Sequence, residues 1–259
     1  MKKTLLSIAG FDPTSGAGLV LDIKVFEELG FNGIGILTSL TVQNTERVKR
    51  IQFIPPDFLW EEYQALKEDM SIAGIKTGMV GSPENAEVLG RIMKEEREIP
   101  VVVDPVFRSS SGAWLLEKNA IPFYLKKIKG KASLFTPNRE EASLITGTKI
   151  GSKETMMEAV REVYSLTEIP SVIKGVSLND KVVDVLFDGK EFHFCENRKI
   201  HKKVHGTGCF YSSSFLCFLA RNESLKDAFR HSNLLTCNAR EKAVSLGRGQ
   251  NIITFPLKP

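Results

Sequence analysis

Short apolar segments alternate with segments of helical period along the chain, and no other feature of the sequence restricts the fold as strongly. The apolar segments are candidate core strands and lie at residues 4–9, 33–37, 74–76, 101–104, 133–135 and 171–174. The amphipathic segments are candidate helices and lie at residues 17–29, 57–70, 84–96, 139–145 and 153–166. This order predicts parallel βαβ units, with the helices forming the outer layers of an α/β sheet.

The C-terminal part of the chain follows a different pattern. Two β-rich pieces at 182–187 and 191–194 are joined by Asp188-Gly189, a strong hairpin signal, so we expect an antiparallel sheet edge there. Two helices are expected at 208–220 and 224–246. Because the sequence contains no repeat, low-complexity stretch or linker, residues 1–259 are predicted to form a single domain.

Composition and charge argue against several classes of protein. The net charge of +4, from 35 basic and 31 acidic residues, is too small to indicate nucleic-acid binding, and the lysine-rich runs lack interleaved aromatic residues. No stretch approaches the ~20 apolar residues of a membrane span, which favours a cytoplasmic protein with no membrane partner. The four cysteines show neither metal-ligand nor disulfide spacing and are expected to be reduced thiols.

A glycine-rich turn runs directly into a helical pattern at His205-Gly206-Thr207-Gly208-Cys209. Such a turn directs several backbone N–H groups to one point, with the positive end of the helix dipole behind them. An anion such as a transferring phosphoryl group would bind there. By itself the motif is more typical of an ordinary glycine-containing loop, because short glycine motifs recur by chance.

A second polar segment, Thr136-Pro137-Asn138-Arg139-Glu140-Glu141, follows a predicted strand at the end where open α/β sheets bind ligands. Asn138 and Glu141 would face one ligand across a helix start, as in kinases where such a pair holds the magnesium that bridges phosphates. The alternative is a capping box, in which Asn138 caps the helix and Glu141 bonds back to it.

A third segment, Gly10-Phe11-Asp12-Pro13-Thr14-Ser15-Gly16-Ala17-Gly18, lies between the first predicted strand and helix. It does not complete GxGxxG, and GxxxxGK[ST] occurs nowhere in the chain. Neither a dinucleotide-binding fold nor a P-loop NTPase is therefore supported, and phosphate must be bound in another way.

Taken together, these segments resemble the ribokinase-like superfamily, and within it the hydroxymethylpyrimidine and phosphomethylpyrimidine kinases of thiamine biosynthesis. The similarity extends from Leu6 to Leu246 and includes Thr41-Val42-Gln43-Asn44-Thr45, Lys76-Thr77-Gly78-Met79 and Val103-Asp104-Pro105-Val106. It implies a three-layer α-β-α sandwich with a mostly parallel sheet and a homodimer. It also implies an ATP- and Mg²⁺-dependent kinase acting on 4-amino-5-hydroxymethyl-2-methylpyrimidine, its monophosphate, or both.

The resemblance also assigns roles to residues at matching positions. Substrate binding falls to Gly10, Asp22, Val42, Gln43, Met79 and Val106, and nucleotide binding to Asn138, Lys174 and Thr207. Catalysis falls to Gly206, Thr207, Gly208 and Cys209, and the magnesium environment to Asp104 and Glu141. The amide of Gln43 offers an acceptor and a pair of donors, which suits a ring nitrogen beside an exocyclic amine.

Cys209 stands where sugar kinases of the superfamily use an aspartate as base, so its thiol would accept the hydroxymethyl proton. A helix N-terminus lowers the pKa of a cysteine, and we therefore expect the thiolate to be favoured at this position. The alternative is an inert buried cysteine, as expected for Cys217 and Cys237.

The chain departs from the family pattern at three places. Where the family has Lys-Gly-Gly-His, this chain has Lys174-Gly175-Val176-Ser177. Where the family has Met-Val-Ala-Lys-Ser-Gly, it has Phe107-Arg108-Ser109-Ser110-Ser111-Gly112. Phe210 stands in place of a small polar residue. Arg108 is either a new anion contact or a solvated loop residue. Two other functions remain open: a pyridoxal-type vitamin B6 kinase, and a catalytically silent ligand-binding protein that kept the fold.

Overall fold

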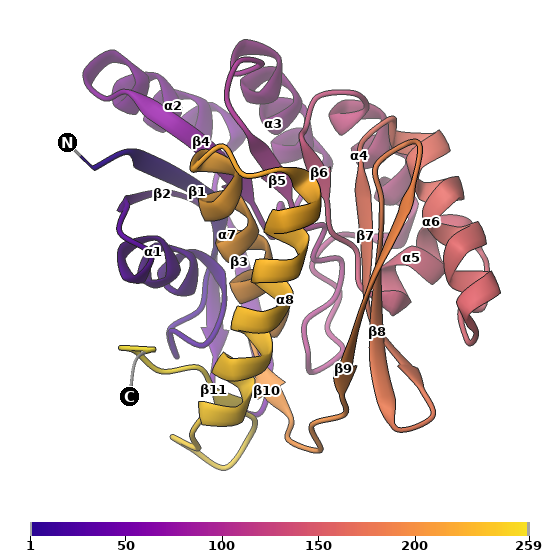
Figure 1. Ribbon diagram of the computed structural model, residues 1–259. Helices are drawn as coiled ribbons and strands as arrows, with labels where there is room; N and C mark the ends of the chain where they lie inside the picture. Colours follow the sequence, from indigo (N-terminus) through magenta and orange to yellow (C-terminus); the bar gives the residue numbers. More distant parts are fainter. Residues whose placement is uncertain (1, 258–259) are drawn as a thin grey trace.

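A nine-stranded sheet forms the centre of the protein in a computed structural model that describes residues 2–257 (Figure 1). The strand order is β3-β2-β1-β4-β5-β6-β7-β8-β9. The strands are β1 (Thr4–Phe11), β2 (Asn32–Gln43), β3 (Val48–Phe53), β4 (Ile72–Thr77), β5 (Val101–Val103), β6 (Leu134–Phe135), β7 (Ser171–Leu178), β8 (Lys181–Phe187) and β9 (Phe192–Arg198). A separate pair joins β10 (Val204–His205) to β11 (Asn251–Ile252).

The central strands run parallel and the outer strands antiparallel. β2, β1, β4, β5, β6 and β7 pair in parallel, whereas β3 at one end and β8 with β9 at the other pair antiparallel. At the β8–β9 turn, Asp188 Oδ1 accepts hydrogen bonds from the amides of Lys190 and Glu191, and Gly189 adopts a φ of +96°. The predicted mostly parallel sheet with an antiparallel edge hairpin is confirmed.

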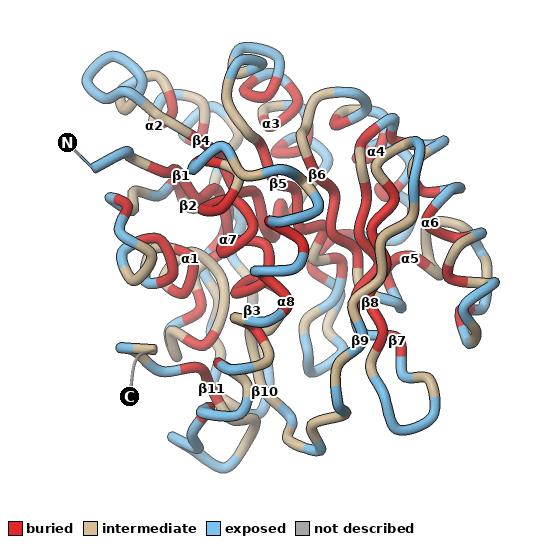
Figure 2. Tube along the Cα trace, in the orientation of Figure 1, coloured by how far each residue is buried: buried red, intermediate tan, exposed pale blue. Residues whose placement is uncertain are grey.

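Helices cover both faces of the sheet. One face carries α1 (Gly18–Glu28), α7 (Thr207–Ala220) and α8 (Leu225–Lys242), and the other carries α2 (Pro56–Asp69), α3 (Pro83–Glu95), η1 (Lys118–Ala120), α4 (Ile121–Ile128), α5 (Arg139–Thr146) and α6 (Lys153–Thr167). Buried residues concentrate along the strands and on the helix faces turned toward them (Figure 2). The fold is the predicted three-layer α-β-α sandwich. None of the described helices combines the length and apolarity that a membrane crossing needs.

Sequence periodicity missed several elements and extended one of them too far. β3 and α4 were not predicted, and the last helix ends at Lys242 instead of 246. Val244 pairs with Ile252, and β11 pairs with β10, so the chain after α8 turns back and joins the separate two-stranded sheet. These long-range pairings override a local pattern that would otherwise continue the helix.

Candidate active site

A cleft of about 630 Å³ opens where the parallel strands end. Its walls come from segments far apart in the sequence, including the β1–α1 loop, the β5–η1 loop, the starts of α5 and α7, and α8. It contains most of the predicted site residues: Gly10, Gln43, Met79, Asp104, Val106, Asn138, Glu141, Lys174, Gly206, Thr207, Gly208 and Cys209. The volume and the mixture of apolar and polar walls suit a small organic ligand with a nucleotide.

The glycine-rich turn forms the N-terminus of α7. Gly206 is the N-cap residue with a φ of +75°, and a Cβ at this position would collide with the carbonyl oxygen of Gly16. Glycine is therefore required both for the left-handed conformation and for the close approach of the two loops. Gly206 carries no side chain to cap the helix, and the first-turn residues Thr207, Gly208 and Cys209 line the cleft, so the start of α7 is a candidate anion site.

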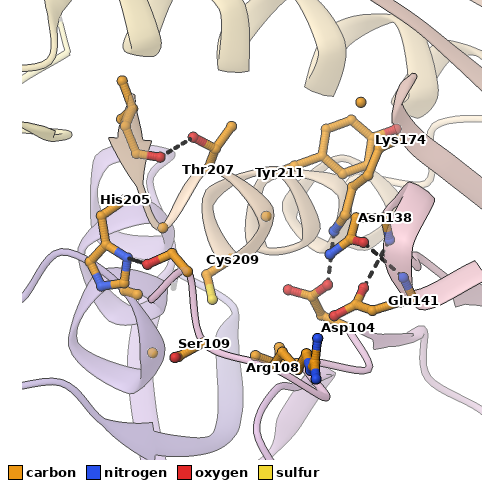
Figure 3. A pocket seen from close by; sticks show the side chains of 18 of the residues that line it. Asp104, Arg108, Ser109, Asn138, Glu141, Lys174, His205, Thr207, Cys209 and Tyr211 are labelled. Carbon is orange, nitrogen blue, oxygen red and sulfur yellow. Dashed lines mark hydrogen bonds and ion pairs between the residues drawn. The ribbon is translucent and has the colours of Figure 1, made fainter. Parts of the chain in front are cut away.

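Cys209 lies in the first turn of α7, between His205 on one side and Asp104 and Lys174 on the other in the view of Figure 3. The side chain lines the cleft but is only 8% exposed. Burial raises the pKa of its thiol to about 11, although the nearby Lys76 ammonium lowers it. The expected lowering of the pKa is therefore wrong, because loss of hydration outweighs the positive charge of Lys76 near the sulfur.

Lys76 reaches the cleft from β4 and is held by a buried ion pair. Its Nζ lies 2.8 Å from Asp22 Oδ2, and both side chains are fully buried. Asp22 also accepts hydrogen bonds from Ser7 Oγ at 2.6 Å and Ser213 Oγ at 2.7 Å. Burial lowers the pKa of Lys76, but Asp22, Cys209 and Asp104 outweigh this effect and hold the pKa above its usual value.

The expectation that Asp22 contacts substrate is corrected by this arrangement. Asp22 lies outside the cleft lining, and its contacts are with protein side chains that fix Lys76 in place. Sequence reasoning gave Lys76 no role beyond a motif match. The sequence signal for Lys76 is a lysine inside a buried apolar strand, because a charge buried there needs a partner of opposite charge.

Replacing Asp22 by alanine is expected to lower the free energy of unfolding by about 3–5 kcal/mol, because it leaves the Lys76 ammonium buried without a counter-charge. Urea unfolding followed by circular dichroism measures the change. Asp69→Ala at the exposed end of α2 is the control and should stay within about 0.5 kcal/mol of the parent. An equal effect of the two substitutions would contradict the structural role of the pair.

A second ion pair lies at the other side of Cys209. Lys174 Nζ is 2.8 Å from Asp104 Oδ1, and both groups are almost fully buried. Asp104 Oδ2 accepts from Ser212 Oγ at 3.2 Å, and Thr136 Oγ1 contacts Oδ1 at 3.3 Å. Burial raises the pKa of Asp104, but Lys174 and Lys76 reverse the effect and leave the pKa below its usual value. Asp104 is therefore ionised in the folded protein.

Asn138 and Glu141 form the capping box that was one of the two interpretations of this segment. Asn138 Oδ1 accepts from the amides of Glu140 and Glu141, and Glu141 Oε2 accepts from the amide of Asn138 at 2.8 Å. Both residues also line the cleft. Burial, together with the charge of Asp104, raises the pKa of Glu141 to about 7. Capping thus fixes the Glu141 carboxylate close to Asp104 and leaves it near the cleft.

Of the six substrate residues carried over from the family, four line the cleft, and Asp22 and Val42 do not. Gly10, Gln43, Met79 and Val106 line it, whereas the Val42 side chain is 47% exposed and lies outside the lining. Val42 therefore contributes at most its backbone, because its side chain points away from the site while that of Gln43 points in.

The departures from the family pattern leave the cleft intact. Val176 is buried and pairs with Val183, while Gly175 keeps a φ of +80° and donates its amide hydrogen to Asp184 Oδ1 at 2.6 Å. Phe210 is buried in an apolar cluster away from the lining. Arg108 does line the cleft, with its guanidinium 4.0 Å from the centre of the Trp114 ring.

The family model described as phosphomethylpyrimidine kinase matches residues 12–254. The chain belongs to this family. It is 38% identical over 252 residues to the hydroxymethylpyrimidine/phosphomethylpyrimidine kinase of Aquifex aeolicus, and the aligned region covers 96% of this chain and 99% of the relative. The family members are phosphotransferases, and the fold and cleft described above are those of such an enzyme.

Solved structures of kinases share the fold. Pyridoxal kinase from Staphylococcus aureus in complex with pyridoxal superposes with a TM-score of 0.89 at 26% identity, covering 98% of this chain and 93% of that one. Phosphomethylpyrimidine kinase from Clostridium difficile 630 gives a TM-score of 0.80 at 31% identity, covering 92% and 99%. The chain is therefore similar to kinases named for two different vitamin precursors.

Proposed function

We propose that this protein transfers the γ-phosphoryl group of ATP to 4-amino-5-hydroxymethyl-2-methylpyrimidine and to its monophosphate. The observation that carries the proposal is the position of Cys209, in the first turn of an uncapped helix N-terminus with a lysine on either side of it. The family membership and the names of the relatives at 30–38% identity support the substrate.

Each group in the cleft has a role in this transfer. Cys209 accepts the hydroxymethyl proton, and Lys76 stabilises the thiolate that accepts it. The amides at the start of α7 bind the phosphoryl oxygens, with Lys174 neutralising further charge. Gln43 binds the aminopyrimidine edge.

Magnesium fits the Asp104–Glu141 side of the cleft. The described residues contain no cluster of three or more His, Cys, Asp or Glu side chains that holds a metal alone. Two neighbouring carboxylates match a magnesium ion that is bound mainly by phosphates and water. Asp104 and Glu141 would hold it, and it would supply charge neutralisation of the ATP phosphates.

The test is ATP consumption with Mg²⁺ by the purified protein, with the pyrimidine alcohol, its monophosphate or pyridoxal as acceptor. The proposal expects turnover of the two pyrimidines at a kcat/KM well above that of pyridoxal. Faster turnover of pyridoxal would support the second candidate, a vitamin B6 kinase, which the similarity to the pyridoxal-bound relative favours. Binding of the pyrimidine without turnover of any acceptor would indicate a silent binding protein.

The rate should rise with pH, because the active form of Cys209 is the thiolate and its pKa in the free protein is about 11. Below that pKa, kcat/KM is expected to increase about tenfold for each pH unit between about pH 7 and pH 9. Initial rates in matched ionic strength measure the profile. A flat profile over this range would exclude proton transfer to Cys209 as the limiting step.

We also propose that the chain acts as a single-domain homodimer in the cytoplasm. The cleft combines residues from Gly10 to Arg240, which supports one functional domain. ATP as donor and four free cysteines support a reducing compartment.

The proposed dimer interface lies on β2. Leu40 and Val42 share one face of this strand beside the edge strand and are 43% and 47% exposed, and a second copy of the chain would cover them. Light scattering of the parent and Leu40→Lys tests the dimer, which should dissociate in the variant.

A further inference from the structure

His205, the last residue of β10, links two loops beside Gln43 at the wall of the cleft. Its Nε2 lies 2.7 Å from Asp12 Oδ2 in the β1–α1 loop, and its Nδ1 lies 3.0 Å from Ser110 Oγ in the β5–η1 loop. His205 is itself fixed by the backbone, because it pairs with Ile252 and precedes the Gly206 turn. The family roles carried over above use none of these three side chains.

Asp12 is a rigid anchor for the imidazole. Asp12 Oδ1 accepts from the amide of Thr14 at 2.9 Å and from Thr14 Oγ1 at 2.8 Å, which leaves Oδ2 for His205. Burial raises the pKa of Asp12, but the bonds from His205 and Thr14 outweigh it and leave the pKa lowered. Gly16 makes room for the ring, since a Cβ there would lie 2.8 Å from His205 Cδ2.

The proton arrangement follows from the anionic partner. With Nε2–H donating to the Asp12 carboxylate, Nδ1 accepts the hydroxyl hydrogen of Ser110. The amide nitrogen of Gln43, 3.3 Å from Nε2, then finds no acceptor on His205. The donors of Gln43 therefore remain available to a ligand in the cleft.

The loop that Ser110 belongs to, residues 107–115, is held together by hydrogen bonds within itself. Phe107 and Leu115 bury its two ends, and Leu115 donates its amide hydrogen to the Phe107 carbonyl at 2.9 Å. Inside it, the amide of Ser109 bonds to Ala113 and that of Gly112 bonds to Ser109. The exposed tip meets the body of the protein through the Ser110–His205 hydrogen bond.

We propose that His205 is a positioning residue that holds the 107–115 loop closed over the cleft by linking Ser110 to Asp12. The closed loop keeps Val106 and Arg108 against the cleft and excludes water from the phosphoryl group. The kinetic consequence rests on the proposed function, whereas closure of the loop does not.

Limited trypsin digestion tests closure without any assay of activity. Arg108 is exposed, but cleavage after it requires the loop to detach from the body of the protein so that the protease can bind it. Mass spectrometry follows the peptide that ends at Arg108. Loss of one hydrogen bond should speed this cleavage about three- to tenfold in Ser110→Ala and His205→Gln. Glutamine retains a donor for Asp12 but does not reach Ser110. The control is Ser111→Ala, which removes a hydroxyl outside the cleft lining whose hydrogen bond, to Ser109 Oγ at 3.0 Å, stays within the loop, so its cleavage should match that of the parent.

Activity gives the second measurement. Ser110→Ala should raise the KM for the pyrimidine and increase ATP hydrolysed per product formed, each about three- to tenfold, with kcat within about twofold. Combining Ser110→Ala with His205→Gln should add nothing in the digestion, because both remove the same bond. Cleavage of Ser110→Ala at the parent rate would overturn the inference, whatever the activity. Faster cleavage in a protein that phosphorylates no acceptor would instead overturn only the proposed function.

Discussion

Replacing Cys209 by alanine is expected to lower kcat for the pyrimidine alcohol by about 10²- to 10⁴-fold, the usual contribution of a general base. The sulfur lies at the head of α7 beside the anion site, where the hydroxymethyl group and the γ-phosphoryl group must meet. No other cysteine reaches this end of the cleft, since Cys237 enters the lining from α8 and Cys195 and Cys217 lie outside it. Steady-state kinetics at saturating ATP measure the loss.

Cys217→Ala is the matched control, because Cys217 is a fully buried thiol of the same helix that does not line the cleft. It should cost some stability but keep kcat within about twofold for the folded fraction. Cys209→Ala should still bind the pyrimidine, because Gln43 and Met79 are unchanged, and calorimetry measures this binding. Undiminished turnover in Cys209→Ala would assign the base elsewhere and leave the thiol a packing role.

Replacing Lys174 by methionine should lower kcat by about 10²- to 10³-fold, the range seen when one preorganised donor to a developing negative charge is removed. Lys174 Nζ is 2.8 Å from Asp104, and Gly208 of the anion turn lies beside it. The substitution removes a positive charge from the proposed phosphoryl path and leaves Lys76 as the remaining lysine that lowers the pKa of Asp104, so this pKa should rise. Single-turnover rates separate this loss from weaker ATP binding.

Lys126→Met on the exposed surface of α4 controls for the change in net charge and should behave like the parent. Lys174→Arg keeps the charge with a different shape and should recover part of the rate. If Lys174→Met folds normally by circular dichroism and retains parent kcat, the lysine acts on Asp104 alone, and the anion site consists of backbone amides.

The amino-acid sequence is enough to predict the layered α/β fold and the family. Alternating apolar and amphipathic segments require buried parallel strands covered by helices, and Asp188-Gly189 is sufficient for the edge hairpin. Several motifs in order identified the kinase family before any contact was known. β3 was missed because its sequence shows little apolar alternation and its place depends on pairing with β2, and α4 was missed because it is amphipathic over only eight residues.

The arrangement of charge around Cys209 depends on contacts between residues far apart in the sequence. Lys76 and Asp22 are 54 positions apart, and His205 reaches Asp12 across 193 positions, so no local pattern predicts either pair. Burial of the thiol reversed the expected direction of its pKa shift, because desolvation depends on the atoms packed around a group. Local propensity acts along the chain, whereas these interactions depend on which residues the completed sheet brings within a few ångströms of one another.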